Sequence, residues 1–125
     1  MKNFNYKDLS VWKKSFSLCL DIYKISMKYP RAELYGLVSQ LRRSAVSIPS
    51  NLAEGHSRQH TKEFINFISI SLGSSAELET QIMISYELKY IDKEEYESLI
   101  NKLVEIIKML KGLLRSLRED YEEKR

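Results

Sequence analysis

The chain has 125 residues, of which 43% are hydrophobic and 30% charged, and its formal net charge is +3. This length suits one domain with one core, and the composition differs from that of disordered chains, which combine low hydrophobicity with high net charge. No apolar run is long enough to cross a membrane, and residues 1–14 contain no signal-peptide core, so we expect one domain over residues 1–125 in the cytoplasm, away from membranes.

The first predicted element is an amphipathic helix over about residues 9–28. Asp8 is a suitable N-cap, because its carboxylate can accept a hydrogen bond from a free amide of the first turn. Apolar residues at helical spacing, including Phe16, Tyr23 and Met27, form the stripe expected to face the core. Pro30 ends the helix, since the residue before a proline is pushed out of helical geometry.

The second helix is predicted over about residues 33–55, with Leu41, Ala45, Ile48 and Leu52 on its apolar face. Pro49 lies inside this pattern. Because proline has no amide proton and clashes with the carbonyl four residues earlier, we expect one helix kinked at Pro49. Gly55 is expected to close or interrupt the helix.

Two further helices are predicted over about residues 61–89 and 93–119. Glu63 suits the first turn of the third helix, and the spacing of Asp92 and Glu95 matches a capping box at the start of the fourth. No run of residues alternates as a strand does. Short connections place consecutive helices antiparallel, so the predicted fold is all-α, an up-down-up-down four-helix bundle.

Two features of the later helices suggest contact with another subunit. The fourth helix carries adjacent apolar pairs, such as Ile106 with Ile107, so its stripe is wider than one core requires. In the third helix, the small residues at positions 73–76 would allow another helix to approach closely. Close packing inside a single bundle explains both features equally well.

Motifs for catalysis and metal binding are absent from the sequence. It contains no phosphate-binding glycine loop and no nucleophile elbow, and its single cysteine, Cys19, suits a small core residue. A di-iron bundle needs two inward-facing Glu-x-x-His motifs, whereas this chain has only His56 and His60. We therefore predict that the protein is not an enzyme and holds neither metal nor cofactor.

Charge is distributed unevenly. Residues 1–62 hold eleven Lys and Arg against four acids, whereas the remainder holds nine against thirteen. This asymmetry fits a surface for a polyanion or, equally, two halves of one bundle that attract each other. The residues considered for phosphate contacts are Arg42, Arg43, Arg58, Lys62, Lys13 and Lys14.

Arg42 and Arg43 are adjacent, so on a helix they point in different directions. We expect one to face a neighbouring helix and form a bidentate ion pair, and the other to face solvent and phosphate. The carboxylates considered for the ion pairs of Arg42 and Arg43 are Glu54, Glu77 and Glu79.

Four segments in this order resemble the 23S ribosomal RNA intervening-sequence protein family: "DLSVWKKSFSLCLDIYKIS", "YGLVSQLRRSAVSIPSNLAEG", "EFINFISISLGSSAELETQI" and "LINKLVEIIKMLKGLLRSL". The resemblance covers about residues 6–118. It implies a small bacterial four-helix bundle, often grouped with ribosomal proteins, and its motif residues here are Arg42, Arg43, Glu54, Glu77 and Glu79. The family offers no catalytic residue to carry over.

The resemblance also implies partners. A similar protein, the accessory variability determinant of diversity-generating retroelements, is a pentameric barrel that binds nucleic acid and a reverse transcriptase. By that similarity we expect a homopentamer, with ribosomal RNA or another nucleic acid, and a reverse transcriptase, as candidate partners. The leading hypothesis is a non-enzymatic, self-associating accessory protein that binds RNA or acts as a scaffold. The alternative is a purely structural oligomer or protein-interaction module that binds no nucleic acid.

Overall fold

The computed structural model describes residues 5–124 and contains four α-helices and no strand within that range. The helices are α1 (Ser10–Ser26), α2 (Leu37–Ser57), α3 (Thr61–Glu87) and α4 (Lys93–Glu123), with short 3-10 turns at Tyr6–Asp8 and Arg31–Glu33. The all-α prediction is confirmed. No helix in the described range combines the length and apolar character needed to span a membrane.

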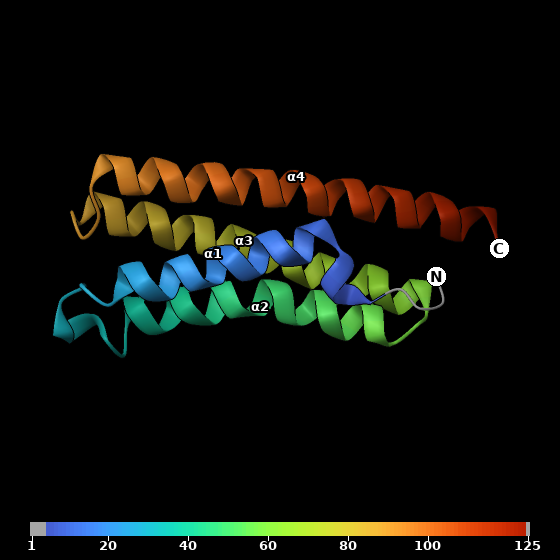
Figure 1. The fold of residues 1–125 in the computed structure, drawn as a ribbon, viewed down its shortest axis with the longest axis horizontal. Helices are drawn as coiled ribbons and strands as arrows, with labels where there is room; N and C mark the ends of the chain where they lie inside the picture. Colours follow the sequence, from blue (N-terminus) through green and yellow to red (C-terminus); the bar gives the residue numbers. More distant parts are fainter. Residues whose placement is uncertain (1–4, 125) are drawn as a thin grey trace.

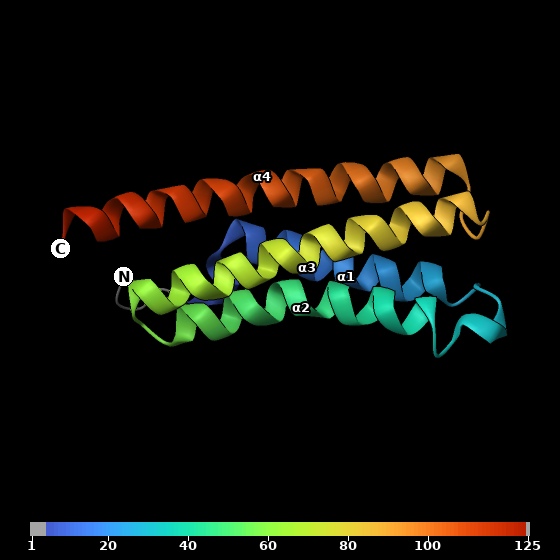
Figure 2. The same ribbon diagram turned by 180° about the vertical axis from the view of Figure 1, so that it is seen from behind.

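The helices pack as a ring of four neighbours. Contacts join α1 to α2, α2 to α3, α3 to α4 and α4 to α1. Figure 1 shows that the chain reverses direction at each connection, so the α1–α2 and α3–α4 connections lie at one end of the molecule. The C-terminal end of α4 extends beyond the α2–α3 connection at the other end, as Figures 1 and 2 both show.

Side-chain capping explains where α4 begins but not where α1 begins. Asp92 accepts a hydrogen bond from the Glu95 amide at 2.8 Å, and Glu95 accepts one from the Asp92 amide at 2.9 Å, which confirms the predicted capping box of α4. The prediction that Asp8 caps α1 is wrong. Asp8 instead accepts from the Asn5 amide at 3.3 Å within the preceding 3-10 turn, and Leu9 occupies the N-cap position of α1.

The second helix starts four residues later than predicted. Pro30 is followed by the 3-10 turn, and Gly36 has a non-helical backbone with φ −116° and ψ −108°. Glu33 accepts a hydrogen bond from the Leu37 amide at 3.2 Å and so satisfies one free donor of the first turn. Pro49 is buried inside α2, and the bend at this residue stays a prediction.

The core is mainly aliphatic, with the rings of Tyr29 and Phe64 added to it, and the other buried residues with polar side chains in the described range are serines. On α1, Ser15 and Ser26 are buried, and their hydroxyls donate to carbonyls of their own helix at 3.1 and 3.3 Å. Serine can therefore occupy a tight helix contact without leaving an unsatisfied polar group. As a result, the buried stripe of α1 is rotated from the predicted one, and Phe16, Tyr23 and Met27 are exposed.

Small residues bring α2 and α3 close together. Gly55 lies within α2, which continues to Ser57, so the expectation that this glycine closes or interrupts the helix is wrong. It is buried against Phe67, and a β-carbon added there would lie 2.5 Å from Phe67 Cβ. Further along, Ser71 Oγ donates to the Ile48 carbonyl at 3.0 Å, and the Ser47 and Ser74 hydroxyls are 2.7 Å apart.

Candidate nucleic-acid interface

The two adjacent arginines diverge. Arg42 turns toward α1, where its Nε donates to Ser26 Oγ at 2.9 Å and its Nη2 donates to the Tyr23 carbonyl at 3.2 Å. Its guanidinium lies 4.7 Å from the centre of the Tyr23 ring. Carbonyls in the last turn of a helix carry partial negative charge, so Arg42 stabilises the end of α1. Arg43, by contrast, is exposed.

The carboxylate partners expected for these arginines lie elsewhere. Glu54 pairs with Arg58 at 2.9 Å, and Arg58 also reaches Glu63 at 3.1 Å. Across residues 5–124, no ion pair within 4.0 Å involves Arg42, Arg43, Glu77 or Glu79. The predicted intrachain ion pairs are therefore wrong, because Arg42 points to α1 while Glu77 is exposed on α3.

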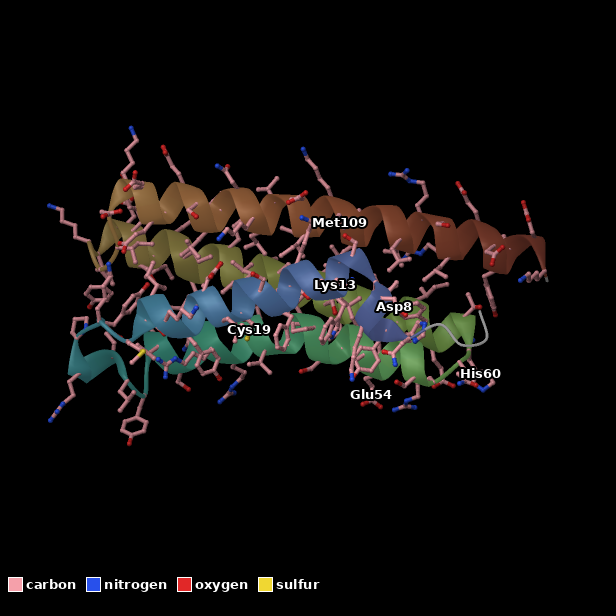
Figure 3. The ribbon with its side chains drawn as sticks, viewed as in Figure 1. Asp8, Lys13, Cys19, Glu54, His60 and Met109 are labelled. Atoms are coloured by element: carbon pink, nitrogen blue, oxygen red, sulfur yellow. The ribbon has the colours of Figure 1, made fainter. Side chains whose placement is uncertain are left out.

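The cations considered for phosphate binding do not form one patch. Arg43 and Arg58 are fifteen residues apart on α2 and its C-cap, or about 22 Å at the helical rise. Figure 3 places Lys13 on α1 and His60 in the α2–α3 connection, close in sequence to Arg58 and Lys62. Lys14 lies 3.6 Å from Glu105, whereas Lys13 and Lys62 are exposed without an ion pair in the described range.

An exposed apolar surface runs along α3. Ile70, Ile84 and Leu88 are 50%, 44% and 51% exposed, and small or polar exposed residues lie between them. We call this surface the α3 face, comprising Ile70, Gly73, Glu77, Thr80, Ile84 and Leu88. None of the exposed large hydrophobic residues of the described range belongs to α4, and the expected contact of that helix with another subunit stays a prediction. The outer residues of its wide stripe, such as Ile107, are partly buried against the core.

A second exposed apolar surface lies between α1 and α2. An open groove there is lined by Tyr23, Leu34, Tyr35, Val38, Ser39, Arg42 and Arg43, and we call it the α1–α2 groove. Tyr35 is 92% exposed, and neighbouring Met27 is 78% exposed. The sequence prediction missed this groove because it placed Tyr23 and Met27 in the core. The available signal was that buried serines could occupy the inner face of α1 instead.

The described residues bear on two candidate chemistries, metal binding and a cysteine nucleophile. No group of three His, Cys, Asp or Glu side chains between residues 5 and 124 is placed to hold a metal ion. Cys19 is buried, and burial raises the pKa of its thiol, so the nucleophilic thiolate is disfavoured. The structure does present a pair of surfaces, the α3 face with apolar residues and one acid, and the α1–α2 groove with two tyrosines and two arginines.

Comparison with known proteins places the chain in a family. The family model described as "23S rRNA-intervening sequence protein" matches residues 7–112. The chain belongs to this family. Among curated proteins, no relative matches it.

A solved structure supports membership of the 23S rRNA-intervening sequence protein family. It is a crystal structure of a protein of unknown function from the S23 ribosomal protein family of Bacteroides thetaiotaomicron. The two chains are 30% identical, the TM-score is 0.75, and the match covers 83% of this chain and 97% of the other. Family membership therefore supports the four-helix fold, and the relative, being of unknown function, does not assign a function to this chain.

The contrast between the arginines gives a first prediction. Replacing Arg42 with alanine removes two hydrogen bonds from a partly exposed cation to the end of α1, and we expect a loss of about 1–2 kcal/mol in the free energy of unfolding. Arg43→Ala is the matched control, with an expected change within about 0.5 kcal/mol. Urea denaturation of both variants, at a dilution where any oligomer has dissociated, measures the difference. Equal losses would contradict the structural role of Arg42.

Proposed function

We propose that this protein is a non-enzymatic helical bundle that associates with copies of itself and offers the assembled surface to RNA. The observation that carries the proposal is the α3 face, where Ile70, Ile84 and Leu88 are each about half exposed. Large apolar side chains that are exposed together on one side of a helix favour a protein interaction site. Covering it with another copy removes that surface from water.

The homopentamer implied by family resemblance agrees with the kind of surface present. A ring of identical chains requires two different surfaces on each chain, one contacting the previous copy and one the next. The α3 face and the α1–α2 groove are two such surfaces on different helices. In this proposal the protein acts as a scaffold whose repeated surface binds its partner.

RNA binding rests on the cations that have no carboxylate partner. Lys13 and Lys62 are exposed and unpaired in the described range, and they lie in the basic half of the chain. Because one chain offers only these two cations to phosphates, a single chain should bind RNA weakly. A ring repeats them in every copy, so a long RNA that engages several copies is held by multivalency.

The second candidate function, a structural oligomer without nucleic-acid binding, is favoured by a specific observation. Arg58 is held between Glu54 and Glu63, and Arg42 is held by the end of α1. Two of the strongest phosphate-binding candidates therefore already have partners inside the chain. This candidate predicts self-association without affinity for RNA.

A salt titration separates the two functions. We expect a 23S-derived RNA fragment to bind the wild-type protein at low salt, with log K falling linearly as log[salt] rises. Lys62→Ala should reduce that slope by about 0.7–0.9 for each copy whose Lys62 contacts a phosphate. Lys108→Ala, which removes an exposed cation from α4, is the control and should leave the slope unchanged. Absence of binding at low salt, with self-association intact, would favour the structural oligomer.

A further inference from the structure

The α3 face contains an acid without a partner. Ile70, Glu77 and Ile84 are spaced by seven residues, or two helical turns, so they lie along one side of α3. Glu77 is exposed between the two isoleucines, and no cation of the described range lies within 4.0 Å of it. If this face is covered by another chain, that chain must supply a positive charge to Glu77, because an unpaired buried carboxylate is strongly destabilising.

The α1–α2 groove has the complementary character. None of its lining residues is acidic, and it contains both Arg42 and Arg43 beside the exposed ring of Tyr35. Arg43 is exposed and has no carboxylate within 4.0 Å among residues 5–124. The groove therefore suits an apolar helix that carries an acid, which is what the α3 face provides.

The two charged residues also lie at similar levels along the bundle. The C-terminal end of α3 and the start of α2 lie at the same end of the molecule (Figure 1). Glu77 is ten residues from the end of α3, or about 15 Å, and Arg43 is six residues from the start of α2, or about 9 Å. A ring whose axis follows the helices keeps these levels in every copy, so long side chains can span the remaining difference.

We propose that the α3 face of one copy docks in the α1–α2 groove of the next, with Glu77 paired to Arg43 across the contact. The inference rests on the proposed self-association and names the two surfaces that carry it. Because the surfaces differ, the contact is heterologous and repeats around a ring. It also explains why Arg43 and Glu77 lack partners within one chain.

Charge reversal tests this contact. Arg43→Glu faces Glu77 of the neighbour with a like charge, and Glu77→Arg faces Arg43, so each single variant should raise the dissociation constant of the oligomer at least about tenfold. The measurement is native mass by light scattering over a dilution series. Glu97→Arg, at an exposed position on α4, is the control and should associate like the wild type.

Rescue makes the test specific. The double variant, Arg43→Glu with Glu77→Arg in one chain, restores opposite charges at every contact and should associate again. Mixing the two single variants should restore association in part, because opposite charges meet wherever the two chains alternate, while a ring of five copies keeps one like-charged contact. Helix content by circular dichroism should stay unchanged throughout, since both substituted positions are exposed.

Several results would overturn the inference. If the wild type associates and both single variants associate equally well, the contact lies elsewhere, while the proposed self-association stands. The same conclusion follows if both singles dissociate and neither the double variant nor the mixture recovers. A wild-type protein that is monomeric over the whole dilution series would overturn the inference together with the proposed self-association.

Discussion

Replacing Gly55 with alanine is expected to lower the free energy of unfolding by about 1–3 kcal/mol. The added β-carbon would lie 2.5 Å from Phe67 Cβ and 3.1 Å from Phe64 Cδ1, so α2 and α3 must move apart. Overpacking of this kind typically costs about 1–3 kcal/mol and occasionally more, and the helix propensity that alanine gains over glycine, about 1 kcal/mol, offsets only part of a severe clash. Urea or thermal denaturation of the two proteins measures the loss.

Gly73 provides the matched control for this prediction. It also lies inside a helix, on the exposed side of α3, but a β-carbon added there meets nothing within 4 Å. Under conditions where the chain is monomeric, Gly73→Ala should raise the free energy of unfolding by up to about 1 kcal/mol, because only the propensity term acts. If Gly55→Ala were as stable as Gly73→Ala, the close approach of α2 and α3 at Gly55 would be wrong.

Placing a charge on the α3 face should dissociate the oligomer. Ile84 is 44% exposed, so Ile84→Asp adds little strain to the single chain, but in the proposed assembly it would bury an unpaired carboxylate. We expect a loss of at least about 3 kcal/mol of association free energy at each contact, which raises the dissociation constant by more than about a hundredfold. Sedimentation velocity of the variant at several concentrations provides the measurement.

Asn101→Asp adds the same charge to an exposed position on α4 and serves as the control for this prediction. It should sediment as the wild type does. If Ile84→Asp also sediments like the wild type, self-association does not use the α3 face. RNA binding offers a second readout, because a monomeric variant loses multivalency and should bind a long RNA more weakly than the wild type.

The helices were predictable because their signals are local. Apolar residues at helical spacing identified all four, and the reciprocal bonds between Asp92 and Glu95 required only two residues three apart. The predicted start of α1 was wrong because the residue expected to cap the helix makes a different hydrogen bond. Asp8 could cap α1, but its carboxylate is already used by Asn5 in the preceding 3-10 turn.

The surfaces were harder to predict, because they depend on which side of each helix is buried. On α1 the polar residues Ser15 and Ser26 face the core and the apolar Phe16, Tyr23 and Met27 face outward, the reverse of a simple hydrophobic rule. The cost of burying serine disappears once its hydroxyl bonds to a carbonyl of its own helix. The spacing of apolar residues alone therefore does not reveal that these serines can be buried.

The partners of Arg42 were also hard to predict, because they lie on another helix. The prediction that Arg42 and Arg43 point apart needed only their adjacency on a helix. Their partners depend on how α2 sits against α1 and α3, and there Arg42 meets the Tyr23 carbonyl while Glu54 meets Arg58. The i, i+4 spacing of Glu54 and Arg58 was a local signal for that pair.

The most direct test of this account is the mass of the wild-type protein in solution. Light scattering coupled to size-exclusion chromatography, repeated from high to low protein concentration, should give an assembly of several copies of the 14.7 kDa chain, with five copies expected from the family resemblance. A single species of 14.7 kDa at every concentration would contradict the account.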